Sequence, residues 1–97
     1  KIDLIAERVL TLGGTPLHTF SDYMANSKLK VGKGISKDVE AIQLILDSLS
    51  VLLQIERAIL TKSNAINDEG TNSMMSDFIA EQEKTIWMLK AWMEEEI

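Results

Sequence analysis

The stretch SKDVEAIQLILDSLSVLLQIERAILTKSN, residues 36–64, decides the fold. Its apolar residues recur at intervals of three and four, which is the period of a helix face and not of a strand. They form two stripes, one of Val39, Ile42, Leu46, Leu49, Leu53 and Leu60, and one of Ala41, Ile45, Leu52, Ile55 and Ile59. A helix with two apolar stripes is buried on two sides. The stretch therefore predicts a long helix inside a bundle or an assembly.

The flanking residues give this helix its limits and its neighbour. Ser36 is a good N-cap, and the acidic residues that follow it suit the helix dipole. Residues 67–70 predict a turn, and residues 71–73 offer caps for a second long helix. The core face of that helix consists of Met75, Phe78, Ile79, Ile86, Leu89 and Met93. Two long helices joined by a short turn are antiparallel.

The residues before the long helix predict two further helical segments. Residues 1–12 carry apolar positions at helical spacing, and Gly13-Gly14 followed by Pro16 ends that segment. Lys1 enters the pattern with no capping residue ahead of it, so we expect the sequence to begin inside a helix. Residues 15–27 predict a short connecting helix capped by Thr19 or Ser21. Residues 28–34 (KLKVGKG) predict a solvated basic loop or a basic patch that binds an anion or a partner.

Composition narrows the possible functions. The 97 residues suit one domain or part of one, and the net charge of −5 disfavours nucleic acid as a partner, because phosphate binding needs clustered Lys and Arg. The absence of Cys excludes disulfides and thiolate metal ligands and fits a reducing, cytoplasmic location. No apolar run approaches the roughly 20 residues of a membrane span.

Asp3 and Glu7 form the first candidate site. Four residues apart on a helix, their carboxylates project from one face about one turn from each other. Carboxylate oxygens bind hard divalent cations, and iron(II) accepts both carboxylate and imidazole ligands. Acidic pairs at this spacing also occur on solvated helix faces, and Arg8 could neutralise Glu7. From spacing alone, the pair is therefore either a metal site or a solvated face.

The other polar residues each have a structural explanation that needs no ligand. Asp68 and Glu69, with Asp77 two turns further on, are acids that the N-terminus of the last helix would attract for its dipole alone. Glu56 interrupts an apolar stripe and is either a metal ligand or the partner of a neighbouring Arg or Lys. His18 follows Pro16 in a connecting segment, so a surface position is expected.

Three motifs occur in order along the chain: Asp3-x-x-x-Glu7-Arg8 followed by Leu12-Gly13-Gly14-x-Pro16, then Asp68-Glu69-Gly70-Thr71-Asn72, then Ile86-Trp87-Met88-Leu89-x-Ala91. Together they resemble the motifs of Dps-type mini-ferritins. The first is similar to the end of the second bundle helix of that family, the second to the turn before its last helix, and the third to a motif within that helix. The resemblance implies one ferritin-like domain over residues 1–97: an all-α four-helix bundle that here lacks the first helix and part of the second, with a short helix in the long connection.

The same resemblance implies a function. Family members oxidise iron(II) with hydrogen peroxide or dioxygen and store the iron(III) mineral in a hollow dodecamer, which protects against oxidative stress. It implies that Asp3 and Glu7 are the catalytic, iron-binding carboxylates of a ferroxidase centre at a two-fold interface, with ligand histidines from the partner subunit. It further implies that Asp68, Glu69 and Asp77 line pores for iron entry; Ser73 stands where relatives often have an acid.

The resemblance has one further consequence, and two alternative functions stay open beside it. The first bundle helix and the ligand histidines of the family lie upstream of Lys1, so we expect them as a separate chain or as further residues. One alternative function is DNA binding, which some relatives perform through basic tails that this portion lacks. The other alternative is an inert helical scaffold without a working iron centre.

Overall fold

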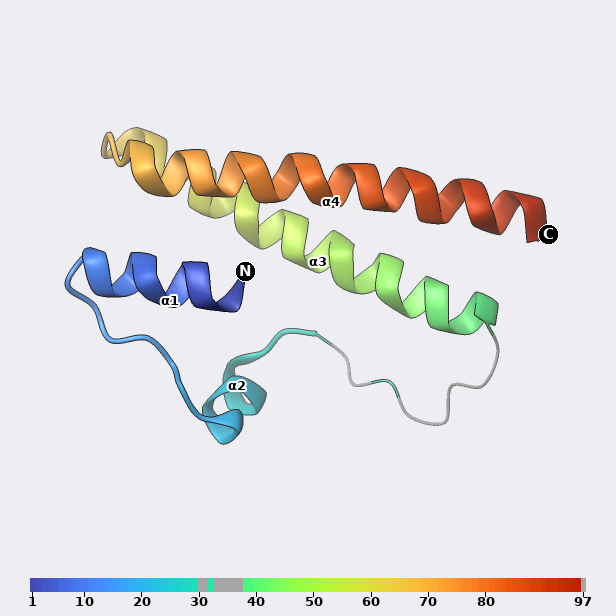
Figure 1. Cartoon of the computed structure of the whole chain (residues 1–97), viewed down its shortest axis with the longest axis horizontal. Helices are drawn as coiled ribbons and strands as arrows, with labels where there is room; N and C mark the ends of the chain where they lie inside the picture. Colours follow the sequence, from blue (N-terminus) through green and yellow to red (C-terminus); the bar gives the residue numbers. More distant parts are fainter. Residues whose placement is uncertain (30–31, 33–37, 97) are drawn as a thin grey trace.

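The computed structural model describes the backbone of residues 1–29, 32 and 38–96, which form four α-helices (Figure 1). These are α1 (Ile2–Thr11), α2 (Phe20–Asn26), α3 (Asp38–Ala65) and α4 (Glu69–Glu96). The described residues contain no strand, which confirms the all-α class. None of the helices among them is both long and apolar enough to cross a membrane. The predicted Ser36 cap and most of the basic segment 28–34 lie outside the described residues.

The long helices α3 and α4 pack against each other as an antiparallel pair (Figure 1). Each has 28 residues and is therefore about 42 Å long. The apolar core between them contains Leu46 and Leu53 from α3 and Met75 and Phe78 from α4, each 5–8% exposed. These residues belong to the first predicted stripe of α3 and to the predicted core face of α4. Burial of the second stripe is not confirmed, because Ile45 is 45% exposed and Ile59 is 37% exposed.

The turn between α3 and α4 depends on Asn67 and Asp68. Asn67 has a φ of 60°, a left-handed conformation that Asn tolerates better than most residues. The Asp68 N–H donates to the Ser63 carbonyl at 2.8 Å, which closes the end of α3. The Asp68 carboxylate then accepts from the Thr71 N–H at 3.2 Å and caps α4. The predicted cap among residues 71–73 is therefore wrong, and α4 begins at Glu69.

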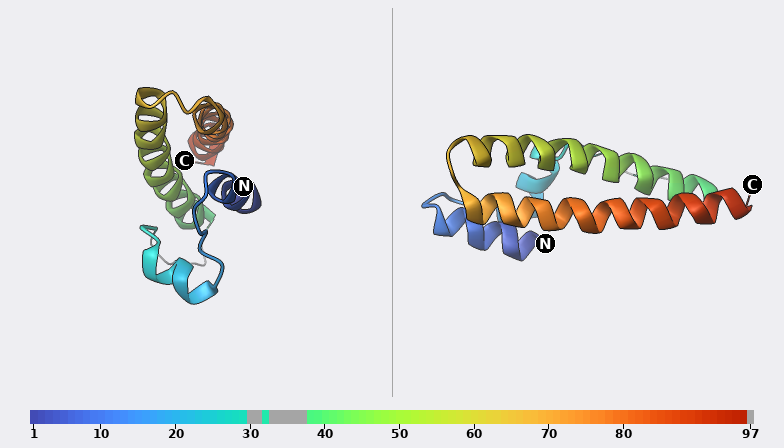
Figure 2. Two further views of the ribbon diagram at one scale, coloured as in Figure 1. Left: turned by 90° about the vertical axis from the view of Figure 1, so that its left-hand side faces the viewer. Right: turned by 90° about the horizontal axis from the view of Figure 1, so that it is seen from above.

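Helix α1 ends as predicted and lies along the first half of α4 (Figure 2). Gly13 adopts a φ of 86°, and the Gly14 N–H donates to the Val9 carbonyl at 2.9 Å. This is the left-handed glycine cap that Gly13-Gly14 predicted. Side-chain contacts from Arg8 to Thr71 and from Lys1 to Glu81 show that α1 runs antiparallel to α4.

Helix α2 is a single short helix on the side of α1 and α3 that faces away from α4 (Figure 1). Of its two predicted caps, Thr19 is confirmed, because its hydroxyl accepts from the Asp22 N–H at 3.1 Å. The Tyr23 hydroxyl donates to the Leu17 carbonyl at 3.1 Å and ties α2 back to the segment before it. α2 is thus the predicted short helix in the long connection.

The described helices leave much apolar surface open along α1. Ile2 is 69% exposed and Ile5 is 44% exposed. They line a groove of about 380 Å³ together with Val9, Leu17 and Tyr23. Side chains of this kind belong in a core, because burying apolar surface stabilises by roughly 25 cal/mol per Å². The arrangement is a partial bundle, as predicted.

A buried polar pair, Glu56 of α3 and Gln82 of α4, interrupts this core. Both residues are 5–8% exposed, and the Gln82 side-chain N–H donates to Oε2 of Glu56 at 2.9 Å. The expected Arg or Lys partner is therefore wrong: the partner of Glu56 is an amide. Oε1 of each residue is buried and accepts no hydrogen bond from the described residues.

Candidate metal centre

Asp3 and Glu7 lie on α1, one helical turn apart, and both are exposed. Neither carboxylate makes a side-chain hydrogen bond or an ion pair with any residue in the described part of the chain. Their negative charges are therefore available to a cation. The predicted shared face is confirmed by the helix that carries them, while their role as metal ligands remains a prediction.

Arg8 does not neutralise Glu7, although it follows it directly. Its guanidinium reaches the first turn of α4, where Nε donates to the Thr71 hydroxyl at 3.0 Å and Nη2 donates to Oδ1 of Asp68. The Thr71 hydroxyl in turn donates to Oδ2 of Asp68 at 2.7 Å. Arg8, Thr71 and Asp68 form a closed ring of hydrogen bonds, which we call the Arg8 ring. It leaves the carboxylate of Glu7 with no competing cation from Arg8.

The Arg8 ring lowers the pKa of the Asp68 carboxyl group. Hydrogen bonds from the Thr71 hydroxyl and N–H, followed by the hydrogen bond and charge of Arg8, lower the pKa of Asp68 below its ordinary value. Because the pKa is lower in the folded protein, the stabilisation from Asp68 is fully present above the unfolded pKa of about 3.9. It is lost as the pH falls through the folded pKa.

Replacing Asp68 by Asn is expected to lower the thermal midpoint most at neutral pH. The difference from the unaltered protein should shrink steadily below about pH 4, because the unfolded chain then binds a proton at Asp68 while the folded protein, with its lower pKa, still holds the charged form. Thermal unfolding followed by circular dichroism between pH 2 and 7, at one protein concentration, measures this difference. A difference that is equally large at both ends of the range would contradict the assigned role of the Asp68 charge.

The other predicted residues do not join Asp3 and Glu7. Glu69 and Asp77 are exposed on α4, and His18 is exposed in the connection between α1 and α2, as expected for a surface histidine. No group of three or more His, Cys, Asp or Glu residues that could hold a metal ion occurs in the described part of the chain. The acidic pair therefore supplies at most two residues to a metal site.

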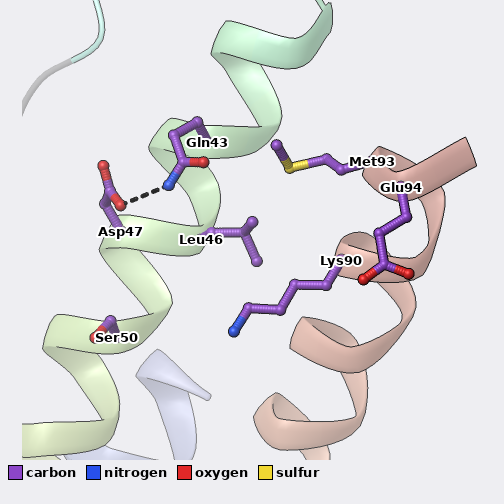
Figure 3. Close-up of a pocket in the computed structure, with 7 residues that line it drawn as sticks. All are labelled: Gln43, Leu46, Asp47, Ser50, Lys90, Met93 and Glu94. Carbon is purple, nitrogen blue, oxygen red and sulfur yellow. Dashed lines mark hydrogen bonds between the residues drawn. The ribbon is translucent and has the colours of Figure 1, made fainter. Parts of the chain in front are cut away.

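A separate groove of about 440 Å³ lies between the N-terminal half of α3 and the C-terminal half of α4 (Figure 3). Lys90 extends from α4 into it, and on α3 the Gln43 amide donates to Asp47 at 2.9 Å. None of the predicted site residues lines this groove. It is therefore distinct from the acidic pair on α1.

Gly70 makes a close contact with Arg8 that sequence reasoning missed. A Cβ atom on Gly70 would lie 2.6–2.7 Å from the guanidinium atoms of Arg8, a distance that real Cβ contacts essentially never show. The guanidinium therefore rests directly on the glycine. A glycine within the first turn of a helix was the available signal, because Gly is unfavourable inside helices unless something approaches closely.

Known proteins resemble this chain along nearly all of its length. The family model described as the ferritin-like domain matches residues 1–96. An uncharacterized protein of Haemophilus influenzae is 45% identical over 94% of this chain and 57% of its own length. A DNA protection during starvation protein of Porphyromonas gingivalis is 36% identical over 95% of this chain and 58% of its own length.

Solved structures agree with these sequence comparisons. The crystal structure of a Dps protein from Vibrio cholerae, described as a member of a superfamily of ferritin-like diiron-carboxylate proteins, superposes with a TM-score of 0.91. The two sequences are 42% identical, and the match covers 94% of this chain and 57% of the Vibrio cholerae chain. The present chain thus spans somewhat more than half the length of the relatives it matches.

Proposed function

We propose that this chain contributes to an iron-oxidising and iron-storing protein shell. The premise is its family, because the chain belongs to the ferritin-like family and is of the Dps type. Asp3 and Glu7 on α1 would supply the carboxylate half of the ferroxidase site. The observation that carries this proposal is the exposed acidic pair whose adjacent Arg8 is held elsewhere by Asp68 and Thr71. A likeness to a protein described as a ferritin-like diiron-carboxylate protein supports it.

Iron(II) is the substrate of the proposed reaction, and the two carboxylates hold it. Anionic oxygen ligands favour the higher charge of iron(III), so binding between Asp3 and Glu7 assists the loss of an electron. Two iron(II) ions give two electrons to one hydrogen peroxide molecule, which takes up two protons and becomes two water molecules. Dioxygen is the alternative oxidant. Removing peroxide in this two-electron way limits hydroxyl radical formation, which is the proposed protective role.

The proposed site is completed between two copies of the protein. Asp3 and Glu7 are exposed, and the described residues supply no third ligand within reach. An exposed two-carboxylate site leaves room for ligands from a facing subunit. Following the resemblance to Dps-type mini-ferritins, we propose that histidines of a partner subunit add the nitrogen ligands, in a homo-oligomer that is a dodecamer in the cytoplasm.

The acids on α4 have the proposed task of admitting iron. Glu69 and Asp77 are exposed and would line pores of the shell, where negative charge raises the local concentration of cations. Asp68 was predicted with them and remains a proposed pore residue. Its carboxylate is already engaged by Arg8 and Thr71, so we assign it the smaller share of this task.

Iron oxidation by the intact protein tests the proposal. Aerobic iron(II), with and without hydrogen peroxide, is added to the protein, and iron(III) formation is followed by absorbance and compared with buffer. We expect oxidation faster than in buffer and iron that elutes together with the protein oligomer on gel filtration. A rate equal to that of buffer would favour the alternative of an inert helical scaffold.

A further inference from the structure

Two hydrogen bonds hold the Arg8 guanidinium, and Gly70 leaves the space that it occupies. Thr71 accepts from its Nε at 3.0 Å, Asp68 accepts from its Nη2, and a Cβ atom on Gly70 would lie 2.6–2.7 Å from guanidinium atoms and would shift them. Its side chain is 25% exposed and that of Asp68 is 15% exposed, so both are largely withdrawn from water. A charged, partly buried arginine that donates to two different acceptors is fixed in position as well as stabilised, because hydrogen bonds from a charged donor are the stronger ones.

Among the described residues, the other polar contacts to α4 from this end of the chain both come from the long side chain of Lys1, whose Nζ also lies 5.3 Å from the centre of the Phe78 ring, and they are weaker. Nζ of Lys1 lies 3.6 Å from Oε2 of Glu81, and the two side chains are 39% and 70% exposed. Exposed ion pairs of this kind contribute little and leave both side chains mobile. The Arg8 ring is therefore the contact that fixes how α1 is rotated and how far it is shifted along α4.

The rotation of α1 decides where the acidic pair points. Glu7 and Arg8 are neighbours on one helix, so any rotation that moves the guanidinium moves the carboxylates of Asp3 and Glu7 by the same angle. A rotation of about 20° displaces a group some 6 Å from the helix axis by about 2 Å, whereas a working metal site tolerates about 0.5 Å. We propose that Asp68, Gly70 and Thr71 are positioning residues for the iron site, acting through Arg8. This inference rests on the proposed function of Asp3 and Glu7.

Cobalt(II) binding to the intact protein tests this inference. Cobalt(II) serves as the probe because its visible absorption reports both affinity and ligand geometry. Gly70→Ala and Thr71→Val are each expected to weaken cobalt binding about tenfold, the size of effect seen when groups that orient metal ligands are lost. Both are also expected to alter the absorption bands. Thr71→Ser, which keeps the hydroxyl, is expected to rescue binding.

Two controls separate positioning from general destabilisation. Arg57→Gln removes an exposed ion pair between α3 and α4, with a 2.8 Å contact to Glu83, and should leave cobalt binding unchanged within about twofold. Gly70→Ala is also made in an Arg8→Ala background. With no guanidinium for the new methyl group to displace, the alanine should weaken binding no further.

The outcomes distinguish the inference from the proposed function. Weaker binding and altered bands in Gly70→Ala and Thr71→Val, together with non-additivity in the double variant, would support the inference. If Glu7→Ala loses cobalt while Gly70→Ala and Thr71→Val bind it as the unaltered protein does, the positioning role is wrong and the proposed site stands. If Glu7→Ala binds cobalt as well as the unaltered protein, the proposed site fails and the inference fails with it.

Discussion

Replacing Glu7 by alanine is expected to slow iron(II) oxidation by about tenfold or more. The change removes one of the two carboxylates that α1 supplies, so the affinity for iron(II) falls. It also removes an anionic oxygen that favours iron(III) over iron(II). Initial rates at low iron-to-protein ratios, with hydrogen peroxide or dioxygen in excess, measure this effect before mineral growth dominates.

Asp3→Asn and Glu40→Ala complete this experiment. Asp3→Asn keeps the size of the side chain but removes its charge, and should also slow oxidation. Glu40 is exposed in the first turn of α3, outside the candidate site, so its replacement by alanine should leave the rate unchanged. An unchanged rate in both Asp3→Asn and Glu7→Ala would remove these residues from the proposed mechanism.

Replacing Gln82 by leucine is expected to lower the free energy of unfolding by about 2–3 kcal/mol. The Gln82 amide donates to Glu56 at 2.9 Å, and Glu56 is only 8% exposed. Without this donor, the Glu56 carboxyl group stays buried with no hydrogen-bond partner among the described residues. The cost of leaving a polar group in this state exceeds the gain from the added apolar side chain. Denaturant unfolding at a fixed protein concentration measures the change.

The double variant Glu56→Leu with Gln82→Leu tests the reason for this loss. Removing both partners leaves no unsatisfied group, so most of the lost stability should return. Gln54→Leu makes the same substitution at an exposed position of α3 and should change stability by less than about 0.5 kcal/mol. A Gln82→Leu protein as stable as the unaltered one would show that the buried hydrogen bond makes no net contribution to the free energy of unfolding.

Local sequence signals predicted most of the helices. Gly13-Gly14 followed by Pro16 placed the end of α1 correctly, because a left-handed cap needs only neighbouring residues. Thr19 was one of two predicted caps of α2 for the same reason. The start of α4 was predicted too late, since Asp68 was interpreted only as an acid attracted by the helix dipole. Its side chain in fact bonds the Thr71 N–H and caps the helix.

Contacts between distant residues were the part that sequence could not supply. Arg8 reaches Asp68, 60 positions away, and no local pattern favours that contact over the adjacent Glu7. Likewise, Glu56 pairs with Gln82 because of how α3 and α4 are shifted along each other. The i,i+4 spacing of Asp3 and Glu7 gave the shared face of the candidate site. The contacts that keep Arg8 away from Glu7 could be seen only in the packing of α1 on α4.

An anomalous diffraction map at the iron absorption edge tests the central claim most directly. Crystals of the intact protein are soaked anaerobically in iron(II), and maps from data above and below the edge are compared. The account predicts an iron peak within bonding distance of the carboxylates of Asp3 and Glu7, with nitrogen ligands from a facing subunit. An intact assembly whose iron peaks all lie away from Asp3 and Glu7 would contradict it.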